Sequence, residues 1–125
     1  MKKLIWCLLF LPLLGYGQTY ELTPLTGGTN TSLRGMSIVS DHVAWVSGSN
    51  GSIEKTIDGG ATWQWIMPAG YETLDFRDIE AFDVDRAVVV TAGAPAFILR
   101  TKDGGKTWTE HYKNVDSAIF LDGMD

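Results

Sequence analysis

The sequence predicts an all-β fold built from repeated four-stranded units, and three observations support this prediction. The segment at residues 56–63 recurs at residues 101–108, 45 positions on, with six of eight residues identical. Short apolar runs of strand length lie between such landmarks and are bounded by Gly, Asn and Asp turn signals. No stretch of the sequence has a helical period. Four strands in a period of 43 to 45 residues are typical of the blades of a β-propeller.

Residues 1–17 have the pattern of a secretory signal peptide. Lys2 and Lys3 precede the apolar stretch 4–14, and small residues around Gly17 suit a cleavage site. We therefore expect cleavage near Gly17 and an exported mature protein, which is periplasmic, secreted or bound at the cell surface. An uncleaved anchor is the alternative, but an apolar core of eleven residues is short for a membrane span. No mature membrane span is predicted.

Residues 18–125 are predicted to be the N-terminal part of a longer Asp-box β-propeller. Residues 20–25 match the fourth strand of the first blade at an offset of 43 positions, and such a strand would close the last blade of a ring. Two full blades follow at residues 33–67 and 76–112, and residues 117–125 begin another. Because two blades cannot close a ring, further blades are expected beyond residue 125.

Each blade is predicted to contain four strands joined by tight turns. In the first blade the strands are residues 36–40, 43–46, 52–57 and 62–66. In the second blade they are residues 78–82, 87–91, 97–101 and 107–112. A second register supports the alignment, because Leu33-Arg34, Phe76-Arg77 and Leu121-Asp122 occupy the same repeat position.

The repeated segment is an Asp box with the pattern Thr-x-Asp-Gly-Gly-x-Thr-Trp. Its Asp is expected to accept hydrogen bonds from backbone N–H groups of its own turn. Its second Gly allows a positive φ, and its Trp is expected to be buried between neighbouring blades. These structural residues are Asp58, Gly60, Thr62 and Trp63 in the first blade, and Asp103, Gly105, Thr107 and Trp108 in the second. The alternative is a catalytic or calcium-binding Asp, but a residue repeated in each blade is a poor candidate for a single active site.

With these boxes the chain resembles the Asp-box, or BNR-repeat, propellers, a superfamily that includes sialidases, some glycoside hydrolases and sorting receptors. Within it, Leu33-Arg34, Phe76-Arg77 and the strand at 43–48 make the chain similar to the photosystem II stability and assembly factor family and its relatives in non-photosynthetic bacteria. The resemblance covers residues 20–125. It implies a non-catalytic protein that acts as a binding or assembly scaffold.

Arg34 and Arg77 are the candidate binding residues. They occupy the same repeat position at the start of the first strand of each blade, so both are expected at one rim of the propeller channel. Guanidinium groups there would bind a protein or an acidic peptide through bidentate contacts with carboxylates. The alternative is that each Arg only pairs with a neighbouring carboxylate such as Asp75 or Asp78.

A glycoside hydrolase or sialidase-like enzyme is the alternative function. Such enzymes place carboxylates on both sides of the scissile bond. The candidates are Glu72, Asp75, Asp78, Glu80, Asp83 and Asp85. Sialidases also carry an early Arg-Ile-Pro motif, whereas this chain has Arg34-Gly35 and Arg77-Asp78. On this hypothesis the catalytic residues would lie beyond residue 125.

Composition and residue types exclude several other classes. The 125 residues include 15 acidic and 10 basic side chains, a net charge of −5, which argues against a nucleic-acid partner. The single Cys7 lies in the signal peptide, and His42 and His111 have no clustered ligands nearby, so no metal site is predicted. No Gly-rich loop precedes a helix, and no cofactor is predicted.

Overall fold

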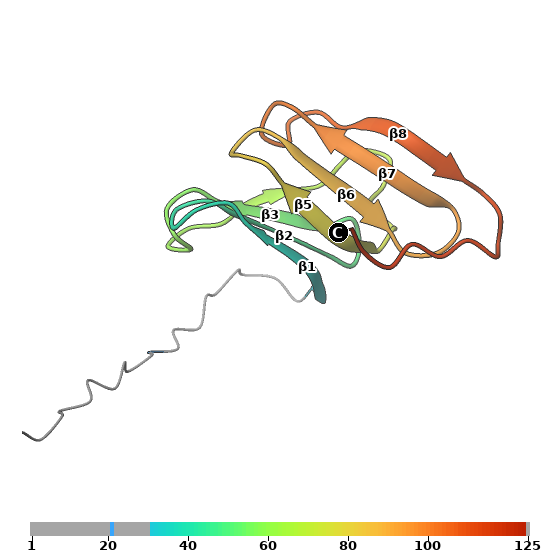
Figure 1. Ribbon diagram of the computed structural model, residues 1–125, viewed down its shortest axis with the longest axis horizontal. Coiled ribbons are helices and arrows are strands. Elements are labelled where there is room, and N and C mark those ends of the chain that lie inside the picture. The colour runs from blue at the N-terminus through green and yellow to red at the C-terminus, as the bar shows by residue number, and fades with distance from the viewer. Residues whose placement is uncertain (1–20, 22–30, 125) are drawn as a thin grey trace, which may run out of the picture.

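The computed structural model describes residue 21 and residues 31–124, which form two antiparallel four-stranded sheets (Figure 1). The first sheet contains β1 (Leu33–Ile38), β2 (Ala44–Gly48), β3 (Ile53–Thr56) and β4 (Gln64–Ile66), in that order. The second contains β5 (Phe76–Ala81), β6 (Ala87–Thr91), β7 (Ala96–Thr101) and β8 (Thr109–Asn114), also in chain order. The predicted all-β class and the four-stranded blades are confirmed.

The ends of several strands differ from the sequence prediction. The first strand of each blade begins earlier than predicted, at Leu33 and Phe76, and the fourth begins later, at Gln64 and Thr109. The later start has a local cause. The backbone N–H of the box threonine donates to the box Asp, so this part of the chain makes an Asp turn before the ladder resumes.

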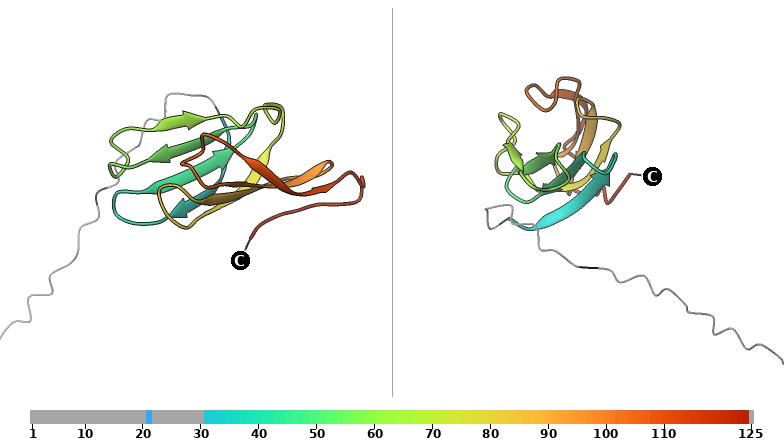
Figure 2. Two further views of the ribbon diagram at one scale, coloured as in Figure 1. Left: turned by 90° about the horizontal axis from the view of Figure 1, so that it is seen from above. Right: turned by 90° about the vertical axis from the view of Figure 1, so that its left-hand side faces the viewer.

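The hydrophobic core lies between the two sheets, which pack face to face (Figure 2). The first sheet contributes Trp45, Ile53 and Ile66, and the second contributes a larger set that includes Phe76 and Leu99. Trp45, Ile53, Phe76 and Leu99 are fully buried. Each blade therefore buries one face against its neighbour, as blades of a propeller do.

The first strands of the two blades lie side by side in the same direction. A Cβ atom added at Gly35 would come within 2.7 Å of the Asp78 Cα, so the two backbones are in close contact there. Two residues on, the Oγ of Ser37 accepts a hydrogen bond from the N–H of Ala81 at 3.0 Å. Residues at the same repeat position in β1 and β5 therefore lie at nearly the same level.

The segment after β8 returns to β5. The N–H of Met124 donates to Asp78 Oδ2 at 2.8 Å, and Gly123 faces the same carboxylate. Gly35, Asp78 and Gly123 occupy the same repeat position. Gly123 lies against Asp78 in the same way that Asp78 lies against Gly35. Residues 117–124 form no strand, because the strand that would pair with them is not among the described residues. Their assignment as the start of a third blade stays a prediction.

The signal peptide at residues 1–17 and its cleavage site lie outside the described residues. So does the predicted closing strand at 20–25, apart from Glu21. Within the described part of the chain, no helix is long and apolar enough to cross a membrane.

Candidate binding rim

The two candidate arginines lie at equivalent irregularities of their strands. Arg34 falls between the paired residues Leu33 and Gly35, where the register of β1 against β2 shifts. Arg77 falls at the same kind of shift in β5 against β6. A β-bulge leaves one residue without a cross-strand partner and redirects its side chain. The bulges therefore direct both arginines away from the regular ladder, at one end of adjacent strands.

Each arginine forms an ion pair with a carboxylate from the next segment along the repeat. Arg34 Nη2 lies 3.5 Å from Asp75 Oδ2, and Arg77 Nε lies 2.7 Å from Asp122 Oδ1. The arginine side chains are 33% and 32% exposed, and those of Asp75 and Asp122 are 44% and 69% exposed. Exposed ion pairs are worth only about 0–1 kcal/mol, so these arginines can exchange one carboxylate for another.

An aromatic ring and a backbone amide complete the rim. The Arg77 guanidinium carbon lies 5.6 Å from the centroid of the Phe120 ring, whose residue is 60% exposed. The N–H of Asn50 donates to Asp75 Oδ1 at 3.4 Å. We name the set Arg34, Asp75, Arg77, Phe120 and Asp122 the arginine rim. It contains two guanidinium groups, two carboxylates and one exposed aromatic ring.

The structure places Arg34 and Arg77 at equivalent bulges at the same end of the adjacent strands β1 and β5, and their role in binding stays a prediction. The alternative interpretation, in which each arginine pairs with a neighbouring carboxylate such as Asp75 or Asp78, agrees with the Arg34–Asp75 pair, while Arg77 pairs with Asp122 and not with Asp78. Asp122 was predicted only as the third member of the repeat register, and Phe120 was not singled out. The Arg77–Asp122 pair could have been predicted from the 45-residue offset between the two residues, which is one full repeat.

The Asp boxes form local hydrogen-bond networks. In the first blade Asp58 accepts from the hydroxyls of Thr56 and Thr62, at 2.8 and 2.6 Å, and from the N–H of Thr62 at 2.9 Å. The Thr56 hydroxyl also accepts from the N–H of Gly60 at 2.9 Å. The second blade repeats this network around Asp103 with nearly identical distances.

These hydrogen bonds change the acidity of both aspartates. The hydroxyl of Thr62, followed by its N–H, lowers the pKa of Asp58 from 3.8 to about 2. The hydroxyl and N–H of Thr107 do the same for the pKa of Asp103. An ionised Asp with its oxygens occupied by its own turn is suited to hold that turn. It is poorly suited to donate a proton or to bind a ligand.

The two box tryptophans are not equally placed. Trp108 packs against the core between the sheets, and its Nε1 donates to the Gly105 carbonyl at 3.1 Å. Trp63 lies on the face of the first blade that points away from the second blade, where it is half-buried beside Ile38 and Gly60. The prediction that Trp63 is buried between blades is therefore not met within the described residues, because no preceding blade covers that face there.

Two of the six carboxylates considered for a hydrolase, Glu72 and Asp83, act as turn acceptors. Asp83 accepts from the N–H groups of Asp85 and Arg86, and its ion pair with the Arg86 side chain lowers its pKa. Glu72 accepts from the N–H of Gly70, which lowers the pKa of Glu72. A general acid in glycoside hydrolysis needs a raised pKa instead. No set of three or more potential metal ligands is grouped within the described part of the chain.

The fold and the rim together define a class: the chain contains two complete blades of an Asp-box β-propeller, each with an arginine at an equivalent bulge of its first strand. The model of one protein family, described as Photosynthesis system II assembly factor YCF48, matches residues 19–114. The chain therefore belongs to this family, and the resemblance stated from the Asp boxes is confirmed.

Solved structures of the family have a similar fold. One is described as YCF48 bound to D1 peptide; it has a TM-score of 0.58 and 25% sequence identity over 76% of this chain. Another is YCF48 from Cyanidioschyzon merolae, with the same TM-score and identity over 74% of this chain. The chain spans about 30% of the length of each of these structures. No curated protein matches the chain significantly.

Proposed function

We propose that this chain belongs to an exported, non-catalytic β-propeller that binds acidic protein segments at the arginine rim and serves as an assembly scaffold. The observation that carries the proposal is the similarity to a YCF48 structure with a bound D1 peptide. The two partly exposed guanidinium groups of Arg34 and Arg77 supply the chemistry for such a peptide. A non-catalytic role agrees with Asp-box carboxylates that are occupied by their own turns.

Reversing both rim charges tests where the peptide binds. The double variant Arg34→Glu, Arg77→Glu should bind a fluorescent hexaglutamate peptide about tenfold more weakly in an anisotropy titration. Each lost exposed pair costs about 0.2–1 kcal/mol, and charge reversal adds repulsion of similar size. The loss should shrink as salt is raised, because exposed charges are screened beyond about 8–10 Å. Lysine at both positions should restore binding only in part, since it keeps the charge without the fork.

Arg86→Glu is the matched control for that experiment. Arg86 is also an exposed arginine in an ion pair, with Asp83, but it follows the turn at the opposite end of β5. It should leave peptide binding unchanged. Equal weakening by Arg86→Glu, or unchanged binding in the double variant, would remove the arginine rim from the proposal and leave its arginines as surface ion-pair residues.

Export rests on the charge and hydropathy pattern of residues 1–17. The mature protein recovered from outside the cytoplasm should begin at or near Gln18 when its N-terminus is sequenced. Mature protein that retains Lys2 and Lys3 would contradict cleavage and favour the uncleaved anchor.

A further inference from the structure

The two arginines of the rim are not equally available to a partner. Arg34 Nη2 lies 3.5 Å from Asp75 Oδ2, which is longer than the usual range of about 2.7–3.2 Å for an N–H···O hydrogen bond. Arg77 Nε donates to Asp122 Oδ1 at 2.7 Å, at the short end of the range for charged pairs. Arg34 is therefore loosely paired, whereas Arg77 is tightly paired.

An aromatic ring supports Arg77 independently of its carboxylate. Phe120 and Asp75 occupy the same repeat position, 45 residues apart, so the second blade has a ring where the first has an acid. The Arg77 guanidinium carbon lies 5.6 Å from the centroid of the Phe120 ring, within the distance of about 6 Å at which a ring attracts a cation. The guanidinium group should therefore keep its place when Asp122 leaves it.

The backbone at Asp122 is held in place while its side chain is exposed. The N–H of Met124 donates to Asp78 Oδ2 at 2.8 Å, and Gly123 lies against the same carboxylate. The Asp122 side chain is 69% exposed, and among the described residues it forms no other hydrogen bond or ion pair than the one with Arg77. A carboxylate tethered in this way has a high effective concentration at Arg77, and it is still free to rotate into solvent.

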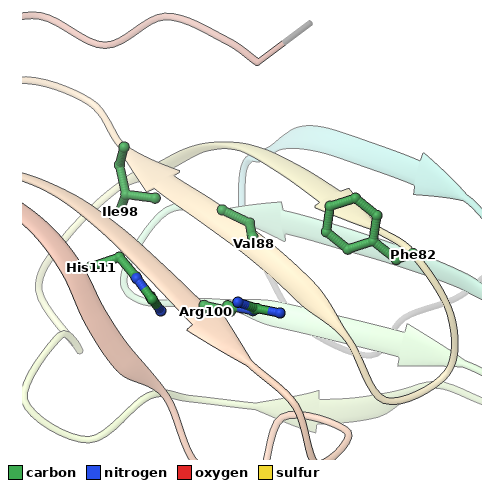
Figure 3. A pocket seen from close by; sticks show the side chains of 5 residues that line it. All are labelled: Phe82, Val88, Ile98, Arg100 and His111. Atoms are coloured by element: carbon green, nitrogen blue, oxygen red, sulfur yellow. The ribbon is translucent and has the colours of Figure 1, made fainter.

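A carboxylate partner is not common to all arginines of the chain. Arg100 lines an open hollow on the second sheet, beside His111 and Phe82 (Figure 3). Within the described part of the chain it forms no ion pair, unlike Arg34 and Arg77. The pairing at the rim is therefore a feature of that site.

We propose that Asp122 is an internal competitor for Arg77, which leaves Arg34 as the first anchor of the arginine rim. This inference rests on the proposed function of the rim. A partner carboxylate has to displace Asp122 before it reaches Arg77, and the affinity at Arg77 is reduced by the fraction of time that Asp122 occupies it. At Arg34 the partner meets only a loose pair.

The order of binding follows from this difference. One carboxylate of an acidic segment binds Arg34 first. A second carboxylate on the same segment is then held close to Arg77, and its high effective concentration lets it replace Asp122. The rim therefore selects extended segments with several carboxylates over single acidic side chains.

Asp122→Asn tests the competitor with the fluorescent hexaglutamate peptide. The variant should bind about three- to fivefold more tightly than the unchanged chain in an anisotropy titration at physiological salt, because Arg77 no longer has an internal carboxylate. Asp75→Asn should gain less than about twofold, since Asp75 pairs only loosely with Arg34. Arg34→Ala should weaken binding more than Arg77→Ala in the unchanged chain, and the two losses should become similar in the Asp122→Asn background.

A double-mutant cycle separates competition from the loss of a negative charge. In an Arg77→Ala background Asp122 has no arginine to occupy, so Asp122→Asn should raise the affinity less than about twofold, by relief of screened repulsion alone. Asp41→Asn is the matched charge control, because Asp41 is exposed after β1, at the opposite end of that strand from Arg34. It should leave peptide binding unchanged, and circular dichroism should show the same β-sheet signal for all variants.

The outcomes distinguish this inference from the proposed function. If Asp122→Asn binds no more tightly than Asp41→Asn, or gains equally with and without Arg77, Asp122 is not a competitor. If binding is also lost in the Arg34→Glu, Arg77→Glu variant, the rim still binds peptides and only the competitor is wrong. If neither the unchanged chain nor Asp122→Asn binds the peptide, both the competitor and the binding rim are wrong.

Discussion

Replacing Trp45 with Ala tests whether the blade interface, and not the Asp boxes, supplies most of the stability. Trp45 is fully buried between the sheets, its Nε1 donates to the Asp83 carbonyl at 3.2 Å, and Lys55 Nζ lies 4.8 Å from the centroid of the Trp45 ring. Substitution of a buried Trp by Ala usually costs about 3–5 kcal/mol. We expect about 4 kcal/mol here, because a hydrogen bond and a cation–π contact are lost with the apolar area.

A loss of that size is a large share of the total stability of about 5–15 kcal/mol that small domains have. The variant would begin to unfold near ambient temperature, so a thermal melt would lack a folded baseline. Urea unfolding in the cold, followed by circular dichroism, is therefore the suitable assay. Trp45→Phe keeps most of the apolar volume but leaves the Asp83 carbonyl without this donor. It should cost only about 1–2 kcal/mol.

Trp63→Ala is the control for the position of the side chain. Trp63 is half-buried on the free face of the first blade, and its Nε1 has no acceptor among the described residues. Its removal should cost about 2 kcal/mol or less, because only part of the ring leaves a packed environment. If Trp63→Ala destabilised the chain as much as Trp45→Ala, the assignment of the core to the interface between the blades would be wrong.

Two further predictions concern the Asp-box turns. The folded pKa of about 2 for Asp58 and Asp103 lies below the ordinary value of 3.8, so their stabilisation is complete above about pH 4 and is lost as the pH falls toward 2. The melting temperature should therefore stay constant from pH 7 to about pH 5 and fall steeply below about pH 4. In Asp58→Asn this fall should be shallower. If the melting temperature of the variant fell with pH as that of the unchanged chain does, the assignment would be contradicted. Gly105→Ala should lower the free energy of unfolding more than Gly93→Ala. Both glycines have a positive φ, of 89° and 74°, but only an added Cβ at Gly105 meets the Ile66 side chain. If urea unfolding gave the same loss of unfolding free energy for both variants, the two blades would not be in close contact at that corner.

The structure of the Asp boxes could be predicted because their contacts are local. The hydrogen bonds around Asp58 join residues no more than four positions apart, and so do those around Asp103. The conformation of such a turn is determined by its own residues and depends little on the rest of the fold. The motif alone therefore indicated the turns, and the 45-residue spacing of the two motifs indicated the blades.

The rim was predictable only in part. The repeat register places Arg34 and Arg77 at equivalent positions, but it does not show that both lie at bulges. The ion-pair partners are 41 and 45 residues away, at different repeat positions relative to their arginines. Which carboxylate an exposed arginine meets depends on how neighbouring blades are stacked, and the sequence period does not specify that.

The sequence by itself determined the unit of this protein: a four-stranded blade, its turn chemistry and its repetition. Only the tertiary structure decided which face of each blade is buried. The run Val43-Ala44-Trp45-Val46 is apolar at every position, so it does not distinguish the two faces of the strand. Neighbouring side chains of a strand point to opposite faces, and a neighbouring blade covers one face at a time. In the described structure that neighbour lies over Trp45 and leaves Met36 and Ile38 exposed to solvent.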